Sequence, residues 1–458
     1  MRIVIVGAGE VGFALAATLS KEGHDVNVVE HREDRIQRVE KLNVRVIQGN
    51  GARPQVLYEA GVRKGCEVDF LVACTDRDEA NILSCWIARH AGVKHVIARA
   101  RGLEFTDSPT WGQDLGIDIM VSPERSVARE ILELLSVSSA VHTAELLGGA
   151  AGIYAFRVAA GSPLIGLSLQ EFRTQNRDLI AIVVCIGRDG ADDIVPDGNT
   201  KMLENDLCYV VSYREQVWRL EKLFQLHSSR PLKRVFIVGG GKLGTQVAQQ
   251  LESHYRGIKI CLFDRDPDKC DRLSTELGST RVLCGEGMDK TLLEEEGIEE
   301  ADGYVCATES DEVNLICCAI AKSLGAHRCI AVVRRRLYRE MSDRMPADAV
   351  VDLNGALASV ILRYIRYPGY SKALAVIEKV DAEMLEVVMP EGHAMLGMPL
   401  SELGLPGGVL VALVGRRAGR KKEVFVPDGT TRLQAGDQVI LFAASSRMHE
   451  AAERFGGL

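Results

Sequence analysis

The chain has 458 residues, of which 47% are hydrophobic and 26% are charged, with a formal net charge of −8 at pH 7. It is too long for a single core, and the negative charge argues against a broad surface for nucleic acid or anionic lipid. No apolar run approaches the roughly 18 to 20 residues that a membrane span requires, and Met1-Arg2 leads directly into an apolar strand without the features of a secretory signal. We therefore expect a cytoplasmic protein.

The first 121 residues alternate between short apolar segments and helical patterns. An apolar strand is followed by Val11, Leu15 and Leu19 at helical spacing, and Gly23 ends this first helix. The predicted strands are 2–6, 25–30, 45–48, 69–75, 95–100 and 115–121, and the further helices are 33–42, 55–60 and 79–91. Such alternation predicts a Rossmann-like, doubly wound parallel sheet of the α/β class.

The pattern changes after residue 121. Ser122 and Pro123 open an amphipathic helix over 126–135, with serine as the cap. Beyond it we expect short strands at 146–158, 180–188 and 207–212, a short helix after Gly166 and a closing helix from Glu215. The turns Arg188-Asp189-Gly190 and Pro196-Asp197-Gly198 suit antiparallel hairpins, so this segment is predicted to be a small α+β module.

The second half of the chain repeats the first. The segments 45–51 (RVIQGNG) and 281–287 (RVLCGEG) match, and so do 75–81 (TDRDEAN) and 308–314 (TESDEVN). The offset shrinks only from 236 residues at Arg45 to 231 at the VPDG turn that begins at Val195. A tandem duplication follows. Its predicted parts are nucleotide-binding domains at 1–123 and 232–348, connecting helices at 124–142 and 349–367, and small modules at 143–227 and 368–453.

Each half opens with an apolar strand followed by Gly-x-Gly-x-x-Gly. In the first half, Gly7 permits the tight turn, Gly9 lets the backbone approach a pyrophosphate, and Gly12 lets helix and strand pack closely. The phosphate would then meet unpaired amides at the helix N-terminus. The candidate phosphate-binding residues are Gly7, Ala8, Gly9, Glu10, Val11 and Gly12, repeated as Gly239, Gly240, Gly241, Lys242, Leu243 and Gly244.

An acidic residue ends the second strand of each half. Glu30 lies 18 residues after Gly12, and Asp264 lies 20 residues after Gly244. A carboxylate there accepts both ribose hydroxyls and repels a 2′-phosphate, so both sites are predicted to favour NAD over NADP. The alternative is a solvated charge at the end of a strand.

Further candidates lie where the strand order reverses. Cys74-Thr75 and Ala307-Thr308 end the fourth strands beside the crevice, and Arg99 ends the fifth strand, where it could reach phosphates. The remaining candidates are Asn50-Gly51 and Glu286-Gly287, near the adenine side or in plain turns, and Arg334, the counterpart of Arg101. Because Val332 replaces Arg99 in the second half, the two sites are expected to differ in ligand preference.

Other polar features have simpler explanations. The twelve cysteines contain no Cys-x-x-Cys pair, which favours buried reduced thiols over a metal or redox site. The basic clusters 334–336 and 416–422, the second at a predicted hairpin tip, are solvated surface or docking sites for the acidic loops of a membrane partner. The two VPDG segments are interpreted as turns.

The combined motifs IVGAGEVG, VVE, CTDRDEAN, SPERSVAREIL and both VPDG turns span essentially the whole chain. With them the chain resembles the TrkA family of RCK (regulator of potassium conductance) proteins, the regulatory subunits of bacterial Trk potassium uptake. The resemblance implies a homo-oligomeric ring, favouring a tetramer, at the inner face of the membrane beneath a potassium-translocating subunit of the TrkH/TrkG type. It also implies binding of NAD(H) or of adenine nucleotides such as ATP and ADP. Its nucleotide residues correspond to Gly7–Val11, Glu30, Cys74, Thr75 and Arg99, and to Gly239–Leu243 with Asp264.

Two other functions compete with this hypothesis. An NAD-dependent oxidoreductase needs a proton-transfer group beside the nicotinamide, but His24, His31, His90 and His95 have no counterparts in the second half. A nucleic-acid-binding regulator is disfavoured by the acidic charge and by the lack of a helix-turn-helix pattern. We therefore expect a regulatory protein that is not an enzyme and that binds no nucleic acid.

Overall fold

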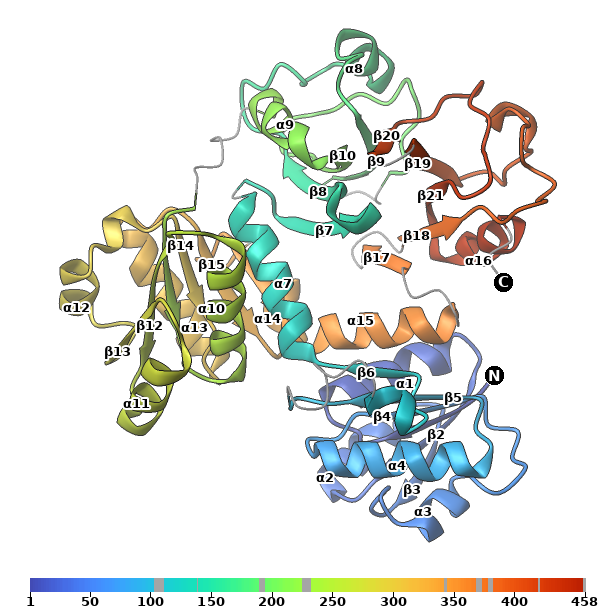
Figure 1. The fold of residues 1–458 in the computed structure, drawn as a ribbon, viewed down its shortest axis with the longest axis vertical. Coiled ribbons are helices and arrows are strands. Elements are labelled where there is room, and N and C mark those ends of the chain that lie inside the picture. Colours follow the sequence, from blue (N-terminus) through green and yellow to red (C-terminus); the bar gives the residue numbers. More distant parts are fainter. Residues whose placement is uncertain are drawn as a thin grey trace. The chain divides into compact units, whose positions relative to one another are not determined.

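The computed structural model describes residues 1–102, 111–137, 139–188, 194–224, 232–341, 344–367, 373–377, 382–418 and 421–455. The chain divides into two compact units, one formed by Met1–Arg129 and Val235–Ile365, the other by Glu130–Arg234 and Arg366–Leu458. The first unit contains two six-stranded parallel sheets, and the second contains a four-stranded and a five-stranded antiparallel sheet (Figure 1). The predicted fold class, a duplicated Rossmann-like sheet with a duplicated small module, is confirmed.

The first parallel sheet has the strand order β3-β2-β1-β4-β5-β6, so the order reverses between β1 and β4. Its elements are β1 (Arg2–Val6), α1 (Glu10–Lys21), β2 (Asp25–Glu30), α2 (Glu33–Val39), β3 (Arg45–Gln48), α3 (Pro54–Glu59), β4 (Phe70–Ala73), α4 (Asp78–Ala91), β5 (His95–Arg99), α6 (Trp111–Asp114) and β6 (Ile119–Val121). The four central strands β1, β2, β4 and β5 are almost wholly buried because helices cover both faces, whereas the edge strands β3 and β6 are more exposed.

The second parallel sheet repeats this topology with the order β13-β12-β11-β14-β15-β16. Its elements are β11 (Arg234–Val238), α10 (Lys242–His254), β12 (Lys259–Asp264), α11 (Pro267–Glu276), β13 (Thr280–Cys284), α12 (Lys290–Glu295), β14 (Gly303–Cys306), α13 (Asp311–Ser323), β15 (Cys329–Val333), α14 (Arg336–Glu340) and β16 (Ala349–Asp352). The two reversal points, β1/β4 and β11/β14, are therefore equivalent.

Several predicted elements of the first sheet are shorter than expected, including the strand expected at 69–75, which covers Phe70–Ala73, and for two others the cause is clear. The strand expected at 115–121 covers only Ile119–Val121, because Gly116 adopts φ +67° and Ile117 donates to the Gly112 carbonyl at 2.8 Å, which closes a turn. The helix expected to reach Leu42 ends at Val39, where the Leu42 amide donates back to the Val39 carbonyl at 2.9 Å. Both differences lie at element boundaries and leave the topology unchanged.

The first antiparallel sheet has the order β7-β8-β10-β9. The single glycine-interrupted strand expected at 146–158 is wrong: the chain forms two antiparallel strands joined at Leu147–Gly149, where Gly148 and Gly149 have φ of +69° and +90°. Of the turn expected at 188–190, Asp189 and Gly190 lie outside the described residues. The elements are β7 (His142–Leu146), β8 (Ala151–Arg157), α8 (Leu169–Gln175), β9 (Ala181–Gly187), β10 (Leu207–Tyr213) and α9 (Val217–Leu223).

The second antiparallel sheet has the order β17-β18-β21-β19-β20. The hairpin expected at 416–422 is confirmed by pairing of β19 with β20, where Arg416 faces Glu423. The residues at its tip lie outside the described part of the chain. The elements are β17 (Ala373–Ile377), β18 (Ala382–Val388), β19 (Leu410–Ala418), β20 (Lys421–Phe425), β21 (Gln438–Ala444) and α16 (Ser445–Arg454).

The helices expected to connect the domains are α7 (Pro123–Ser136) and α15 (Leu353–Arg366). Serine 122 caps α7 as predicted, since its hydroxyl accepts from the Arg125 amide at 3.3 Å. Among the described residues, none of the helices combines the length and the apolar character that crossing a bilayer requires.

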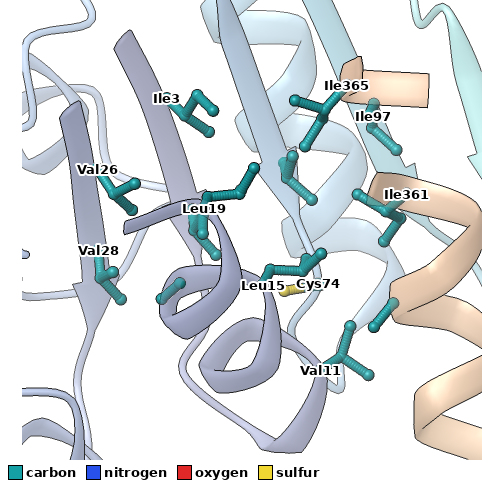
Figure 2. Close-up of a cluster of buried hydrophobic side chains, with 14 of the residues drawn as sticks. Ile3, Val11, Leu15, Leu19, Val26, Val28, Cys74, Ile97, Ile361 and Ile365 are labelled. Atoms are coloured by element: carbon teal, nitrogen blue, oxygen red, sulfur yellow. The ribbon is translucent and has the colours of Figure 1, made fainter. Parts of the chain in front are cut away.

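Helix α15 does more than connect, because it completes the core of the first parallel sheet. Its residues Ile361 and Ile365 pack in one cluster with β1, β4 and β5 and with α1, and Figure 2 shows them facing Ile97, Cys74 and Val11. Tyr364 also meets the ring of Phe70 edge-on, with centroids 6.3 Å apart. A helix from the second half thus buries one face of the first half's sheet.

Candidate functional site

The strand-to-helix turn has the same backbone geometry in both halves. Gly7 and Gly239 have φ of +99° and +105°, values that side chains rarely adopt. A β-carbon on Gly12 would lie 1.8 Å from the Gly7 carbonyl oxygen, and one on Gly244 would lie 1.9 Å from that of Gly239. Only glycine permits this approach of helix to strand, which is the structural role that the motif predicts.

The middle glycine of each motif lies at an open helix N-terminus. Gly9 and Gly241 are the N-caps of α1 and α10, and as glycines they have no side chain to accept from the first amides of these helices. A β-carbon on Gly241 would meet no atom within 4 Å, and one on Gly9 would meet only the Arg35 guanidinium, at 3.7 Å or more. The open space and the unpaired amides fit a phosphate group. We call each turn with its helix N-terminus a cradle.

Glu30 lies buried at the edge of the first cradle, with its side chain 1% exposed. One carboxylate oxygen accepts from the Ala8 amide at 2.7 Å, and the other accepts from the amides of His31 and Arg32 at 2.7 and 3.0 Å. Burial raises the pKa of Glu30, but these three hydrogen bonds and the nearby Arg35 outweigh burial and hold the pKa below its ordinary value. The group is therefore an ionised acceptor fixed beside the turn.

Asp264 takes the same place in the second cradle, with its side chain 9% exposed. It accepts from the Gly240 amide at 2.7 Å and from the Asp266 amide at 2.9 Å. Lys269 lies 4.0 Å away. Both predicted ribose carboxylates thus bind the glycine turn itself, whereas a solvated strand-end charge would make no such bonds. Their contact with a ribose remains a prediction.

The reversal point contains a hydrogen-bond network that was not predicted from the sequence. Asn81 accepts from the Thr75 amide and hydroxyl at 2.9 and 2.6 Å and donates to the Arg99 carbonyl at 2.9 Å. Asn314 makes the equivalent bonds to Thr308 and to the Val332 carbonyl. These asparagines tie β4 to β5 and β14 to β15. Their presence at the ends of TDRDEAN and TESDEVN was the available signal.

An aspartate in the same motif anchors the loop after the fifth strand. Asp78 accepts from the amides of Arg101 and Gly102, both at 2.8 Å. Asp311 accepts from the amides of Arg334 and Arg335, both at 3.0 Å. No role for these aspartates was predicted from the sequence, although the repeated motif contains both.

The arginines near the reversal point differ between the halves. Arg99 is 7% exposed, and its Nε has no hydrogen-bond partner in the described part of the chain. Burial, followed by the neighbouring Arg101 guanidinium, lowers the pKa of Arg99. Its counterpart Val332 is buried and apolar, while Arg334 donates to the Thr308 carbonyl at 2.7 Å. The second half thus places a different arginine at its crevice.

The helix starts also differ in charge. Glu10 begins α1 and pairs with Arg38, whose guanidinium stacks 4.0 Å from the ring centroid of Phe13. Lys242 begins α10 and is exposed. A negative side chain therefore lies at the mouth of the first cradle where the second has a positive one.

The remaining candidates are tightly packed. A β-carbon on Gly51 would lie 2.2 Å from Val6, and one on Gly287 would lie 2.3 Å from Val238, so these glycines let the loop cross the first strand. Asn50 accepts from the Ala52 amide at 2.9 Å and Glu286 is exposed in the equivalent turn. Cys74 is buried, which raises its pKa to about 12, and Ala307 is buried in its place.

The other polar features mostly match their structural interpretations. In the VPDG turns, Asp197 and Asp428 each accept from a threonine hydroxyl and from nearby amides. Within the cluster 416–422, Arg416 forms an ion pair with the buried Asp437 at 2.7 Å, so it is neither a solvated nor a docking residue. In the cluster 334–336, the exposed Arg335 pairs with Glu312 at 3.0 Å.

The cysteines need a correction. Ten of them are buried, but Cys66 is half-buried and Cys284 is exposed because it is the last residue of the edge strand β13. Among the described residues, no cluster of three or more potential ligands that could hold a metal ion is present.

Comparison with known proteins places the chain in a family. The TrkA-N domain model matches residues 3–123 and 235–353, and the TrkA-C domain model matches 153–225 and 384–456. The chain belongs to the TrkA family. It is 32% identical to Trk system potassium uptake protein TrkA homolog 2 of Methanosarcina mazei over 99% of this chain and 100% of that protein. It is 30% identical to Trk system potassium uptake protein TrkA of Azorhizobium caulinodans over 99% and 98% of the two chains.

Solved structures share the fold of this TrkA family member at lower identity. The GsuK RCK domain aligns with a TM-score of 0.60 at 19% identity, covering 100% of this chain and 95% of that chain. The GsuK channel bound to NAD aligns with a TM-score of 0.61 at 19% identity, covering 100% and 79%. These alignments show that the chain shares the fold of these structures over its whole length.

Proposed function

We propose that the protein is a cytoplasmic regulatory subunit of a potassium-uptake system. It binds NAD(H) or adenine nucleotides in its two cradles and controls potassium transport through a separate membrane subunit of the TrkH/TrkG type. The observation that carries the proposal is the pair of open cradles within a chain that matches TrkA proteins over nearly its whole length.

The residues of the cradles fit a dinucleotide. The unpaired amides at Gly9 and Gly241 would hold the phosphates, and Glu30 and Asp264 would hold the ribose hydroxyls. Related folds include a GsuK channel bound to NAD and a GsuK structure bound to ADP, which supports this ligand class. The carboxylates would exclude a 2′-phosphate.

The packing of α15 offers a path between the halves. Val11 follows the first cradle and lies in the same core cluster as Ile361 and Ile365 of α15. A nucleotide that shifts the start of α1 would therefore press on a helix that belongs to the second half. Such coupling shifts a two-state equilibrium only by the difference in affinity for the two states.

In a ring of subunits, the free energy that shifts the two-state equilibrium is shared among the nucleotide sites. Moving an equilibrium from 1:99 to 99:1 takes about 5.5 kcal/mol, which in a tetramer with two cradles per chain is roughly 0.7 kcal/mol per site. No single site then needs a large difference in affinity. We place this ring at the inner face of the membrane, against the transporter.

Reconstitution of the membrane subunit in potassium-loaded vesicles tests the proposal. Adding the protein should make potassium flux depend on NAD, NADH, ATP or ADP, and a chain carrying Gly9→Ala and Gly241→Ala should leave flux insensitive to all four. If flux ignored the wild-type protein and every nucleotide, the regulatory function would be wrong.

The competing function, an NAD-dependent oxidoreductase, is tested separately. We expect the absorbance of NADH to stay constant when the protein is incubated with candidate metabolites, because the cofactor here acts as a ligand. A steady, protein-dependent loss of NADH with any metabolite would restore the enzyme hypothesis.

A further inference from the structure

Two cysteines lie side by side at the rim of the second cradle. The thiol of Cys270, on α11, donates to the Asp264 carbonyl at 3.3 Å and lies 3.8 Å from the Leu283 carbonyl. Cys284 follows Leu283 and is the strand partner of Asp264 in the sheet. The two side chains are near enough for Cys284 to influence the Cys270 thiol electrostatically. The backbone of the ribose carboxylate is therefore in contact with both cysteines.

The two thiols differ in access to solvent. All twelve cysteines lie in the described part of the chain, and Cys284 is the only one that is exposed, whereas Cys270 is buried. Burial and the neighbouring Cys284 side chain raise the pKa of Cys270 to about 11. A reagent from solvent thus meets Cys284 first, with a second thiol held behind it.

Helix α11 connects this pair to the glycine turn. Leu273 lies almost one turn after Cys270, and a β-carbon on Gly240 would be only 2.6 Å from its Cδ1 atom. The Gly240 amide in turn donates to Asp264 at 2.7 Å. Any movement of α11 toward β13 therefore disturbs the packing of the turn and the carboxylate that faces it.

The first cradle lacks this pair. Gln48 is the strand partner of Glu30, as Cys284 is of Asp264. The buried Ile36 of α2 takes the place of Cys270. Thiol chemistry can therefore act on one cradle and leave the other unchanged.

We propose that Cys270 and Cys284 form a peroxide-sensitive thiol pair whose oxidation to a disulfide weakens nucleotide binding in the second cradle. The effect on binding rests on the proposed function, whereas formation of the disulfide does not. The disulfide replaces the bond from Cys270 to the Asp264 carbonyl and draws α11 toward β13.

The chemistry requires hydrogen peroxide as the oxidant. The Cys284 thiolate attacks one peroxide oxygen, so an S–O bond forms, the O–O bond breaks, and the leaving hydroxide takes up a proton to become water. The sulfur of Cys270, after losing its proton, then attacks the Cys284 sulfenic acid; the S–S bond forms and a second water leaves. Two thiols and one peroxide thus give one disulfide and two waters, and an added dithiol reverses the reaction.

Peptide mapping tests the disulfide. After treatment of the full chain with dilute peroxide and alkylation, trypsin should release Cys270–Arg272 linked to Val282–Lys290, and dithiothreitol should separate them. Cys284→Ser and Cys270→Ser should both abolish the linked peptide, and the half-buried Cys66→Ser is the matched control that should retain it. Oxidation of Cys284 to higher acids with Cys270 still unlinked would overturn the proposal.

Calorimetry with NADH tests the consequence for binding, in a Gly9→Ala chain that retains only the second cradle. Peroxide should weaken binding at least about fivefold, dithiothreitol should restore it, and Cys284→Ser should remove the sensitivity. A linked peptide with unchanged NADH affinity would overturn the regulatory part. If the reduced chain bound no NADH, the proposed nucleotide site in the second cradle would be wrong. Peptide mapping would still show whether Cys270 and Cys284 form a disulfide.

Discussion

The two cradles share a backbone and differ at their rims. In both, the first glycine has a left-handed backbone, and a carboxylate accepts from the amide of the residue after it. In both, a β-carbon added to the third glycine would lie less than 2 Å from the carbonyl oxygen of the first glycine. The rims differ at four of the places described, where Glu10, Arg99, Ile36 and Gln48 in the first half correspond to Lys242, Val332, Cys270 and Cys284 in the second. Duplication has kept the parts that the turn needs and varied the parts that a ligand or a reagent would meet.

The residues that both cradles share serve folding, and the rim residues that differ serve binding. The first and third glycines of each turn must be kept in both halves, because a side chain there would strain or collide with the backbone. A residue on the rim can change without such a cost, so the two sites can acquire different affinities. Substitutions at matched positions in the two halves test that division.

The largest effect should come from Gly12→Ala or Gly244→Ala. The new β-carbon would collide with a backbone carbonyl at 1.8 or 1.9 Å, so we expect the free energy of unfolding of that domain to fall by about 3 kcal/mol or more. Gly241→Ala is the matched control: it has space and an ordinary φ of −74°, so it should keep its melting temperature but lose nucleotide. A Gly12→Ala protein as stable as wild type would contradict the packing argument.

The next effect concerns the ribose carboxylates. Glu30→Ala should weaken NAD(H) binding in the first cradle by about 1 to 3 kcal/mol, through loss of charge-assisted hydrogen bonds. The wild-type protein should bind NAD(H) at least tenfold more tightly than NADP(H), or roughly 1.4 kcal/mol. Asp25→Ala, at the exposed start of the same strand, is the control. Equal calorimetric affinities for NAD and NADP would rule out this role.

Replacing Arg99 should make the first cradle resemble the second. Arg99→Val introduces the residue found at position 332, and we expect about a tenfold loss of nucleotide affinity in the first cradle only, or ~1.4 kcal/mol. Stability should not fall, because the substitution removes a buried charge whose Nε has no partner within the described ranges. A clear loss of stability with unchanged binding would make Arg99 a structural residue instead.

The smallest effect is a pH dependence of stability. The pKa of Glu30 is below its ordinary value of 4.5 in the folded protein, so its contribution to stability is present above that value and is lost as the pH falls through the folded-state pKa. Acid unfolding of Glu30→Gln should therefore be less steep in this window than that of wild type. Glu59→Gln, at the exposed end of α3, should behave as wild type; identical acid unfolding of all three would exclude a lowered pKa.

Much of this architecture was predictable because local signals and their repetition agreed. The glycine motifs, the strand-end acids and the alternation of elements specified both parallel sheets. The turn at Leu147–Gly149 was missed because consecutive apolar residues and glycines resemble one interrupted strand as well as two paired ones. The packing of Ile361 against the first sheet could not be seen, since it joins residues more than 250 positions apart that share no pattern.

The site was predictable to the same extent. Its glycines and acids follow a known spacing, but Asn81 and Asp78 act through bonds to backbone groups that only the folded sheet brings near. The rim thiols were also missed, because Cys270 and Cys284 do not form a Cys-x-x-Cys pair in the sequence. They come together only when α11 packs on β13.

The central claim is that each half of the chain binds one nucleotide, with unequal affinity. Calorimetric titration of NADH into four proteins tests it most directly: wild type, Gly9→Ala, Gly241→Ala and the double variant. We predict two unequal sites per chain in wild type, one remaining site of different affinity in each single variant, and none in the double variant. A single site in wild type that Gly241→Ala leaves unchanged, or two sites that survive in the double variant, would contradict it.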